Sequence, residues 1–401
     1  MRLKWVELDR FRNLEQQKVQ LHPRYNLLLG RNGQGKTNFL EAIGYLGTLR
    51  SFRTAGRGEM IKRQESMCRV SGSVVSEGGE KVLALALTRA GRTQFLDDKK
   101  ITSPEEFLQA LKIVHFIPED VGLIAGSPAW RRKVLDRAVF EITPHYASEY
   151  RKYLMTLRQR NALLRKGIAS VPELKSWNSS LASNGAVLIQ RRQDMINNLN
   201  PLLDELGRQL GLGEGLRLIY VASRQMTRPC GELQDHVGED GICTQSQLPD
   251  RSYIERSLLQ KLEELAEKEN RSGHTLAGPH RDNIIFKFGK EERSTDLARY
   301  GSQGQKRSAV LAFKLALAIN FQKQKGFWPL VLLDDVASEL DVTRRKALGS
   351  IIRGTDAQFF ISTTGEEYMF LPAEEGRIFQ VTDGRLEPFS VSGRSRHLAD
   401  N

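Results

Sequence analysis

The sequence predicts an α/β fold built around a phosphate-binding loop, and four segments carry that prediction. Residues 30–37 read GRNGQGKT and match the pattern G-x-x-x-x-G-K-[ST] at every fixed position. A short apolar run at residues 25–29 precedes them. Residues 36–46 carry apolar side chains at helical spacing, with Gly47 as the expected end of the helix. Residues 330–333 form an unbroken apolar run, which is typical of a parallel strand buried on both faces.

The residue types in the phosphate loop predict how a nucleoside triphosphate binds. Glycines let backbone N–H groups turn inward around phosphate oxygens, and the start of the following helix adds the positive end of its dipole. We expect Lys36 to contact the β- and γ-phosphates and to act in catalysis, and the Thr37 hydroxyl to bind Mg²⁺. A glycine-rich turn without function is the alternative, and the agreement of both flanking elements disfavours it. The predicted ATP contacts of this loop are Gly30, Arg31, Asn32, Gly33, Gln34, Gly35, Lys36 and Thr37.

Two acids, Asp334 and Asp335, follow the apolar run at 330–333. They should emerge at the carboxyl end of the strand, where open α/β sheets bind ligands. We assign Asp334 to Mg²⁺ and Asp335 to catalysis, as the group that polarises the attacking water. The alternative is a solvated acidic turn, which is less consistent with a phosphate loop earlier in the chain.

A third polar segment, Ser302-Gln-Gly304-Gln305, precedes a predicted helix at residues 306–322. Ser302 is well placed as a helix cap next to N–H groups that can face an anion. The segment resembles the signature motif of ABC-type ATPases. That resemblance implies that Ser302, Gly304 and Gln305 contact the γ-phosphate held by another subunit.

A second ABC-type resemblance lies just after the two acids. Residues 338–341, which end at Asp341, resemble the dimer-contact loop of this class, so Asp341 is a further predicted nucleotide contact. Both resemblances imply an ATP-dependent homodimer in which two copies enclose two ATP molecules and hydrolyse them together.

The composition is that of a globular protein able to bury a sizeable core, in about two or three domains, with 401 residues of which 40% are hydrophobic. We expect no membrane partner, because no run approaches the apolar length that spans a bilayer. Cys68, Cys230 and Cys243 are odd in number and lack C-x-x-C spacing, so disulfides and zinc are not expected. The predicted location is cytoplasmic.

The formal net charge is +12, and it is concentrated in two segments. Residues 131–166 carry a net charge of +7, and residues 50–69 carry +4. Such clusters suit a nucleic-acid backbone, although a solvated helix face remains an alternative for each. We interpret Tyr146, Tyr150 and Tyr153 as packing residues, not as base-stacking residues, because their spacing is helical.

The order of patterns along the chain predicts a split head. Strand-like runs occur within residues 3–29 and at 81–88, 217–222 and 283–288. Between them, two runs at heptad spacing, separated by residues 166–172, predict a short antiparallel coiled-coil hairpin of about three heptads per arm. The predicted divisions are 1–115 (head, first part), 116–274 (helical arm), 275–389 (head, second part) and 390–401 (disordered tail). The heptad positions are Tyr146, Tyr150, Tyr153, Leu157, Arg160 and Leu164 in the first run, and Leu174, Trp177, Leu181 and Leu188 in the second.

In segments that cover nearly its full length, the chain resembles the RecF family of SMC-like, ABC-type ATPases. One segment departs from the family pattern, because Val134 stands where an aromatic residue is preferred. The resemblance implies an α/β ATPase head interrupted by a mainly helical arm. The matching segments are residues 11–13, 38–43, 118–120, 126–128, 131–136, 158–161, 278–282 and 334–341.

The RecF resemblance implies an ATP-dependent DNA-binding protein of replication and recombinational repair, active in the response to DNA damage. It would bind gapped, single-stranded or double-stranded DNA and help RecR, with RecO as a possible further partner, to load RecA. ATP and Mg²⁺ are the implied cofactors. Asp335 stands where many relatives have a glutamate, and residues 359–364 end without the usual switch histidine. We therefore expect weak, DNA-stimulated hydrolysis that times dimerisation.

The sequence leaves three alternatives open: the role of His280 and two rival functions of the chain. His280 could be catalytic or a structural turn residue. An overcoming-lysogenization-type ATPase with nuclease activity is a rival function, but no carboxylate cluster suggests a nuclease metal site. A transporter ATPase subunit is another, and the long insertion and the basic charge disfavour it.

Overall fold

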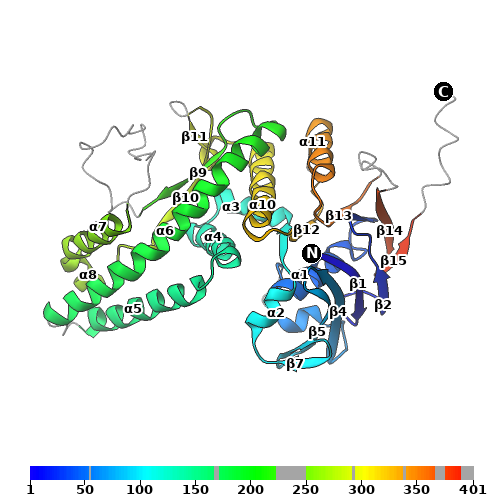
Figure 1. Ribbon diagram of the computed structural model, residues 1–401, viewed down its shortest axis with the longest axis horizontal. Helices are drawn as coiled ribbons and strands as arrows, with labels where there is room; N and C mark the ends of the chain where they lie inside the picture. Colours follow the sequence, from blue (N-terminus) through cyan, green and yellow to red (C-terminus); the bar gives the residue numbers. More distant parts are fainter. Residues whose placement is uncertain are drawn as a thin grey trace. The chain divides into compact units, whose positions relative to one another are not determined.

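The computed structural model describes residues 1–53, 56–166, 171–222, 250–290, 294–336, 340–365 and 375–389. These residues form two compact units (Figure 1). Unit 1 contains Met1–Asp120, Gln209–Gly211 and the chain from Leu317 onward, and unit 2 contains Val121–Arg208 and Leu212–Ala316. Segments from both ends of the sequence therefore build unit 1. The domain boundaries at 115/116 and 274/275 remain predictions, and residues 390–401 lie outside the described part of the chain.

Unit 1 contains a mainly parallel sheet in the order β15-β14-β3-β13-β12-β8. All neighbouring pairs are parallel except β14 and β15, which form an antiparallel hairpin. The predicted strands at 25–29 and 330–333 are confirmed as β3 and β12, and every residue of β12 is buried. The strands are β3 (Tyr25–Leu29), β8 (Ile113–Phe116), β12 (Leu330–Leu333), β13 (Phe359–Thr363), β14 (Gly376–Thr382) and β15 (Arg385–Pro388).

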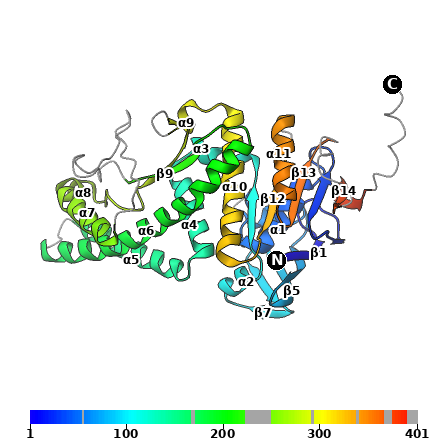
Figure 2. The same cartoon turned by 45° about the horizontal axis from the view of Figure 1, so that its top comes forward.

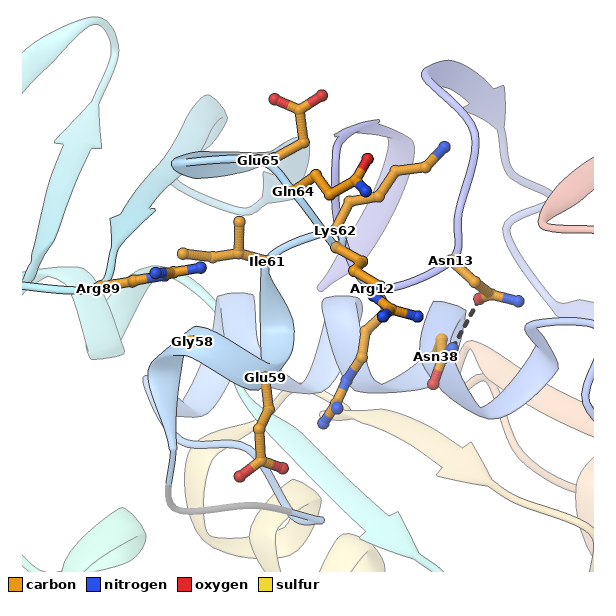
Figure 3. Close-up of a pocket in the computed structure, with 11 residues that line it drawn as sticks. Arg12, Asn13, Asn38, Gly58, Glu59, Ile61, Lys62, Gln64, Glu65 and Arg89 are labelled. Atoms are coloured by element: carbon orange, nitrogen blue, oxygen red, sulfur yellow. Dashed lines mark hydrogen bonds between the residues drawn. The ribbon is translucent and has the colours of Figure 1, made fainter.

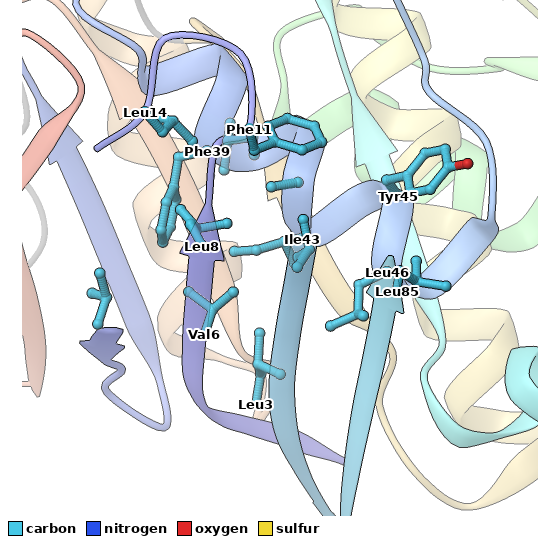
Figure 4. Close-up of a cluster of buried hydrophobic side chains, with 14 of the residues drawn as sticks. Leu3, Val6, Leu8, Phe11, Leu14, Phe39, Ile43, Tyr45, Leu46 and Leu85 are labelled. Atoms are coloured by element: carbon cyan, nitrogen blue, oxygen red, sulfur yellow. The ribbon is translucent and has the colours of Figure 1, made fainter. Parts of the chain in front are cut away.

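A second, antiparallel sheet in unit 1 has the order β2-β1-β4-β5-β6-β7. Helix α1 (Lys36–Thr48) buries Phe39, Ile43 and Leu46 in one hydrophobic core with residues of β1 and β5 (Figure 4). The same core includes Leu28 and Leu332 of the parallel sheet, so α1 packs between the two sheets. The strands are β1 (Arg2–Asp9), β2 (Gln17–Gln20), β4 (Met67–Ser76), β5 (Gly79–Thr88), β6 (Arg92–Leu96) and β7 (Lys99–Ile101). The other helical elements are η1 (Arg57–Met60), α2 (Pro104–Ala110), η2 (Pro118–Val121) and α11 (Val342–Arg353).

The predicted end of α1 at Gly47 was wrong. The helix continues to Thr48, and Leu49 ends it in a left-handed conformation with φ 55°. Gly47 has a packing role instead: a Cβ at this position would lie 2.4 Å from Cδ1 of Ile113 on β8. The glycine lets the helix approach the sheet closely.

Unit 2 is mainly helical and has a small sheet in the order β11-β10-β9. The strands predicted at 217–222 and 283–288 are confirmed as β9 and β10. Helix α10 begins in unit 2 and continues into unit 1. The helices are α3 (Gly122–Ala125), α4 (Pro128–Ile142), α5 (Tyr146–Lys166), α6 (Val171–Gln209), α7 (Arg251–Glu264), α8 (Ala266–Ser272), α9 (Leu297–Tyr300) and α10 (Gln303–Lys325). The strands are β9 (Arg217–Val221), β10 (Asn283–Phe288) and β11 (Thr295–Asp296).

Helices α5 and α6 form the predicted antiparallel hairpin and lie side by side in both views (Figure 1, Figure 2). Thr156 Oγ1 accepts a hydrogen bond from Asn184 Nδ2, and Arg160 Nε donates to Asn178 Oδ1, so residue numbers rise on one helix as they fall on the other. α5 has 21 residues, or three heptads, as expected. α6 has 39 residues and is longer than predicted, because buried apolar side chains continue past its Pro201 to Leu206.

Arg160, at a predicted heptad position, forms a fully buried ion pair with Glu269 of α8, with 2.6 Å between Nη2 and Oε2. The same guanidinium donates to Asn178 Oδ1 of α6 and to Thr275 Oγ1. Glu269 Oε1 accepts the backbone N–H of Leu276 at 2.6 Å. Buried charges persist in proteins when they are paired and hydrogen-bonded in this way. The network therefore fixes α5, α6 and α8 to one another.

His280 occupies a structural position in the same unit. Tyr153 of α5 donates its hydroxyl hydrogen to His280 Nδ1 at 2.6 Å, and His280 Nε2 lies 3.2 Å from the carbonyl oxygen of Thr275. A carbonyl can only accept, so the hydrogen of the neutral ring belongs on Nε2. Both ring nitrogens then have partners, which favours the structural role over the catalytic one.

We predict that His280 makes the stability of unit 2 depend on pH. Burial lowers the pKa of His280 from 6.5 to about 4. The hydrogen bond to Thr275 opposes this shift, and the positive charges of Arg281, Arg132 and Arg192 add to it. Between these two values the unfolded chain binds a proton that the folded chain does not, so the free energy of unfolding falls as the pH drops. The total loss is about 3 kcal/mol at 1.36 kcal/mol per pKa unit.

Urea unfolding followed by circular dichroism at several pH values between 7 and 4 measures this loss. His280→Gln should flatten the pH dependence, whereas His274→Gln, at an exposed histidine six residues away, should leave it unchanged. Equal slopes for wild type and His280→Gln would contradict the assignment of a neutral, buried imidazole.

Candidate nucleotide-binding site

The phosphate loop connects β3 to α1 in unit 1 and has the backbone shape that phosphate binding requires. Gly33 and Gly35 have φ values of 83° and 113°, a left-handed region that favours glycine. A Cβ on Gly35 would also lie 3.0 Å from Cδ2 of Leu14. The predicted strand, loop and helix start are thus confirmed, and α1 begins at Lys36.

The ammonium group of Lys36 lies over the loop. Its Nζ donates to the carbonyl oxygens of Gly30 at 2.6 Å and Arg31 at 2.9 Å. Burial lowers the pKa of Lys36, and the carboxylates of Asp335 and Asp334 act in the opposite direction. The two acids, which come from a distant part of the sequence, therefore lie close enough to Lys36 to raise its pKa.

The C-terminal hairpin β14–β15 holds the phosphate loop from outside. The N–H of Gly384 donates to the carbonyl oxygen of Gln34 at 2.9 Å, and the N–H of Asp383 donates to Gln34 Oε1 at 2.6 Å. A Cβ on Gly384 would lie 2.1 Å from the carbonyl oxygen of Asn13. Because the side chain of Gln34 is bound to this turn, its predicted contact with ATP would come from the backbone N–H.

The acids reach the phosphate loop because of the strand order. β13 pairs with both β3 and β12, so the carboxyl ends of these three strands meet at one edge. Thr37 donates its hydroxyl hydrogen to Asp334 Oδ1 at 3.0 Å, across 297 residues of sequence. Ser362 of β13 donates to the same oxygen at 2.5 Å. Burial raises the pKa of Asp334, and these two hydrogen bonds oppose that shift.

The oxygen ligands at this edge fit Mg²⁺. A hydroxyl and a carboxylate from the protein, with phosphate oxygens from the nucleotide, are the hard ligands that Mg²⁺ prefers. Mg²⁺ in nucleotide sites uses only one or two protein carboxylates, so a cluster of three or more ligating side chains is not required. The described residues contain no cluster of three or more histidine, cysteine, aspartate or glutamate side chains that could hold a metal. Thr37 and Asp334 would hold the ion.

Asp335 adopts a left-handed backbone conformation with φ 47°. Its N–H donates to Ser362 Oγ at 2.9 Å. That Asp335 polarises the attacking water remains a prediction. No pattern in the sequence predicts that Ser362 lies beside both acids.

A cavity of about 480 Å³ lies beside the phosphate loop, on the side of Asn13 and Asn38 (Figure 3). Asn38 Nδ2 donates to Asn13 Oδ1 at 2.7 Å. Arg12 donates twice to the fully buried Glu41 of α1, at 2.9 and 2.7 Å. These residues are not among the predicted site residues, although residues 11–13 and 38–43 both belong to the family pattern. The lining residues are Arg12, Asn13, Asn38, Gly58, Glu59, Ile61, Lys62, Arg63, Gln64, Glu65 and Arg89.

The signature segment lies in unit 2 and caps α10, as predicted. Ser302 Oγ accepts the N–H of Gln305 at 3.2 Å, and Gln305 Oε1 accepts the N–H of Ser302 at 2.8 Å. This reciprocal arrangement is a capping box. The helix begins at Gln303, three residues before the predicted start. Ser302 is exposed and could reach a nucleotide. The Gln305 side chain accepts a hydrogen bond from the N–H of Ser302, and it would have to break that bond to contact a nucleotide.

Asp341 caps α11, with its Oδ1 accepting the N–H of Arg344 at 2.9 Å. Two further residues of the predicted dimer-contact loop at 338–341, Ser338 and Glu339, lie outside the described residues. A nucleotide contact by Asp341 therefore stays a prediction.

The basic segment at 131–166 is not a continuous surface. Arg131 is buried and donates to the carbonyl oxygens of Leu123, Ile124 and Gly126. Arg132 donates to the carbonyl oxygen of Asp282, and Arg160 forms the buried ion pair with Glu269. These cations stabilise the fold of unit 2, so the interpretation of the whole segment as a DNA surface was wrong for Arg131 and Arg160. The exposed basic residues of the two segments are Lys133, Arg151, Lys152, Arg158, Arg165 and Lys166 in one, and Arg50, Arg53, Arg57, Arg63 and Arg69 in the other.

Two of the three tyrosines of α5 pack in the interior as predicted, and Tyr150 is only half-buried. Tyr146 and Tyr153 are buried, and Tyr146 donates to Asp136 Oδ1 at 2.6 Å. Asp136 also receives two hydrogen bonds from the buried Arg192 of α6, at 2.7 and 2.9 Å. These aromatic residues belong to the interior of the hairpin.

The comparisons with known proteins agree with this geometry. The RecF/RecN/SMC N terminal domain family matches residues 2–386. An Smc head bound to the C-winged helix domain of ScpA shares the fold, with a TM-score of 0.57 and 17% identity over 98% of each chain. The fold and its phosphate loop therefore define an ABC-type, SMC-like ATPase head, as predicted from the sequence.

The sequence relationship is closer to one branch of that class. The DNA replication and repair protein RecF of Geotalea uraniireducens is 34% identical over 389 residues, which cover 96% of this chain and 100% of that protein. A solved structure of the recombination mediator protein RecF with ATP, in the RecFOR pathway, has a TM-score of 0.78 and 29% identity, and covers 97% of this chain and 98% of its own. The chain belongs to the RecF family.

We predict that Gly384→Ala weakens nucleotide binding at the phosphate loop. The added Cβ would meet the carbonyl oxygen of Asn13 at 2.1 Å and push the turn away from Gln34. Loss of the two hydrogen bonds to Gln34 should lower the affinity for a fluorescent ATP analogue about tenfold, equivalent to roughly 1.4 kcal/mol.

Gly326→Ala is the matched control. Gly326 has the same φ of 83° but nothing within 4 Å of its Cβ position, so this variant carries only the backbone strain of about 1 kcal/mol. Equal nucleotide affinities in the two variants would exclude a role for the hairpin in shaping the loop.

Proposed function

We propose that this chain is an ATP-dependent DNA-binding protein of DNA replication and recombinational repair. The observation that carries the proposal is the hydrogen bond between Thr37 and Asp334, which joins a complete phosphate loop to the acid after β12. Relatives that match nearly the whole chain bear the name DNA replication and repair protein, and one relative was solved with ATP.

ATP and Mg²⁺ are the proposed cofactors. The loop at residues 30–37 would bind the phosphates, Lys36 would contact the β- and γ-phosphates, and Thr37 with Asp334 would hold Mg²⁺. Bound Mg²⁺ would neutralise charge on the phosphates. Asp335 would polarise the attacking water. Its side chain is shorter than a glutamate, and β13 ends in threonines where ABC-type relatives carry a histidine, which supports slow hydrolysis.

The active form in this proposal is an ATP-dependent homodimer. Ser302 is exposed at the start of the 23-residue helix α10, where backbone N–H groups of the first turn have no partner within the helix. Such an end attracts anions. Ser302, Gly304 and Gln305 of one copy would contact the γ-phosphate held by Lys36 of the other.

DNA and mediator proteins are the proposed partners. The preferred DNA would be gapped, with single-stranded and double-stranded parts, and the proposed protein partners are RecR and possibly RecO, with RecA loading as the outcome. No helix in the described part of the chain has the length and apolarity to span a membrane. We propose a cytoplasmic location and a weak, DNA-stimulated ATPase activity.

Complementation between two inactive variants tests the composite site. Lys36→Met removes the charge that contacts the phosphates, and Ser302→Arg fills the position opposite the partner's nucleotide with a bulky cation. Each variant alone should lose ATP-induced dimerisation and hydrolysis. Their mixture should regain ATP-induced dimerisation, because a heterodimer combines the phosphate loop of the Ser302→Arg copy with the signature of the Lys36→Met copy in one intact site.

The matched control mixes Ser302→Arg with the double variant Lys36→Met/Ser302→Arg, a pair that contains no intact site. Analytical ultracentrifugation and an ATPase assay would compare the two mixtures at equal protein concentration. Recovery in both mixtures, or in neither, would contradict the composite site. Full activity of Lys36→Met alone would contradict the assignment of the phosphate loop.

Salt dependence of DNA binding tests the basic surfaces. We expect three exposed arginines of unit 1, changed together as Arg50→Gln, Arg57→Gln and Arg63→Gln, to weaken binding to gapped DNA. Each lost phosphate contact should make the slope of log affinity against log salt less steep by about 0.9, or about 2.7 for three contacts. These side chains are exposed, so the fold and ATP binding should survive.

A parallel variant of unit 2, with Arg151→Gln, Lys152→Gln and Arg158→Gln, separates the two surfaces. These three side chains on α5 are also exposed. Fluorescence anisotropy at several salt concentrations gives the slope for each variant. If neither slope changes, both clusters are solvated faces and the DNA-binding surface lies elsewhere.

A further inference from the structure

Ser362 is a buried serine on β13 that touches both acids of the site. It is fully enclosed, with an exposed fraction of 0%. Its strand lies between β3, which leads into the phosphate loop, and β12, which leads into Asp334 and Asp335. The hydroxyl group therefore lies at the edge where the predicted nucleotide and Mg²⁺ ligands meet.

The direction of the hydrogen bonds at Ser362 follows from its chemistry. The N–H of Asp335 can only donate, so Ser362 Oγ accepts it at 2.9 Å. The single hydroxyl hydrogen of Ser362 is then free to point to Asp334 Oδ1, at 2.5 Å. One side chain thus holds the carboxylate of the first acid and the backbone of the second.

Both acids need such support. Asp334 is buried, with 4% of its surface exposed, and an ionised carboxylate in that setting is stable only when donors surround it. Thr37 supplies one donor to Oδ1 and Ser362 supplies the other. Asp335 has a left-handed φ of 47°, which costs a non-glycine residue energy unless neighbouring groups fix it.

We propose that Ser362 is a positioning residue for Mg²⁺ and for the attacking water. It orients the Asp334 carboxylate toward the ion and fixes the turn that directs Asp335. This inference rests on the proposed function, because it assumes that Thr37 and Asp334 hold Mg²⁺ next to bound ATP. β13 thereby contributes a serine to the site near its end, where residues 359–364 lack the histidine of ABC-type relatives.

The test measures nucleotide binding as a function of Mg²⁺ with a fluorescent ATP analogue. Ser362→Ala should raise the Mg²⁺ concentration for half-maximal binding by about 10-fold to 100-fold, the usual effect of removing a group that orients a metal ligand. Binding of the same analogue in EDTA should stay at the wild-type level, because the phosphate loop itself is unchanged. The EDTA measurement also reports whether the variant folds.

Two further variants separate positioning from simple packing. Ser362→Thr keeps the hydroxyl and should restore most of the Mg²⁺ affinity. Ser308→Ala makes the same truncation at a buried serine whose hydroxyl has no hydrogen-bond partner among the described residues, and it should leave the Mg²⁺ dependence unchanged.

The outcomes distinguish this inference from the proposed function. A wild-type Mg²⁺ dependence in Ser362→Ala overturns the positioning role while leaving the ATP site intact. An equal rise in Ser362→Ala and Ser308→Ala assigns the effect to packing and also overturns it. A wild-type protein that binds no nucleotide with or without Mg²⁺ instead contradicts the proposed function itself.

Discussion

The adjacency of three parallel strands, β3, β13 and β12, is the constraint on which the candidate site depends. Parallel strands present their carboxyl ends at one edge, so the phosphate loop, Ser362 and Asp334 meet although they come from three distant parts of the chain. The hydrogen bond of Thr37 to Asp334 results directly from this order. If β13 were not between the other two strands, both acids would lose their contacts with Ser362. They would also no longer lie at the same edge of the sheet as the phosphate loop.

The supports around the site come from backbone groups as much as from side chains. Gly384 and Asp383 bind Gln34 from outside the loop, and Gly47 lets α1 approach β8 closely. These contacts hold the loop in a shape in which Lys36 Nζ donates to the carbonyl oxygens of Gly30 and Arg31. A loop that is shaped in advance loses less entropy when a ligand binds.

Charge has two separate uses in this protein. In unit 2, Arg131, Arg160 and Arg192 are buried and hydrogen-bonded, and they join helices and loops that the apolar pattern alone would not fix. The exposed basic residues are a different set and are the ones available to a phosphate backbone. A net charge read from the sequence adds the two sets together, so it overstates the surface that DNA could contact.

The sequence by itself determined the local features: the phosphate loop between β3 and α1, the apolar strand β12 before Asp334, the capping position of Ser302 and the antiparallel hairpin of α5 and α6. These depend on residue type and short-range spacing, which fix backbone conformation within a few residues. Only the tertiary structure decided that Ser362 binds both acids, that Gly384 contacts the loop, that Arg160 pairs with Glu269 and that α1 continues past Gly47. Each of these features joins residues far apart in the chain or depends on close packing. The spacing of side chains along the sequence does not predict which distant group a side chain will contact.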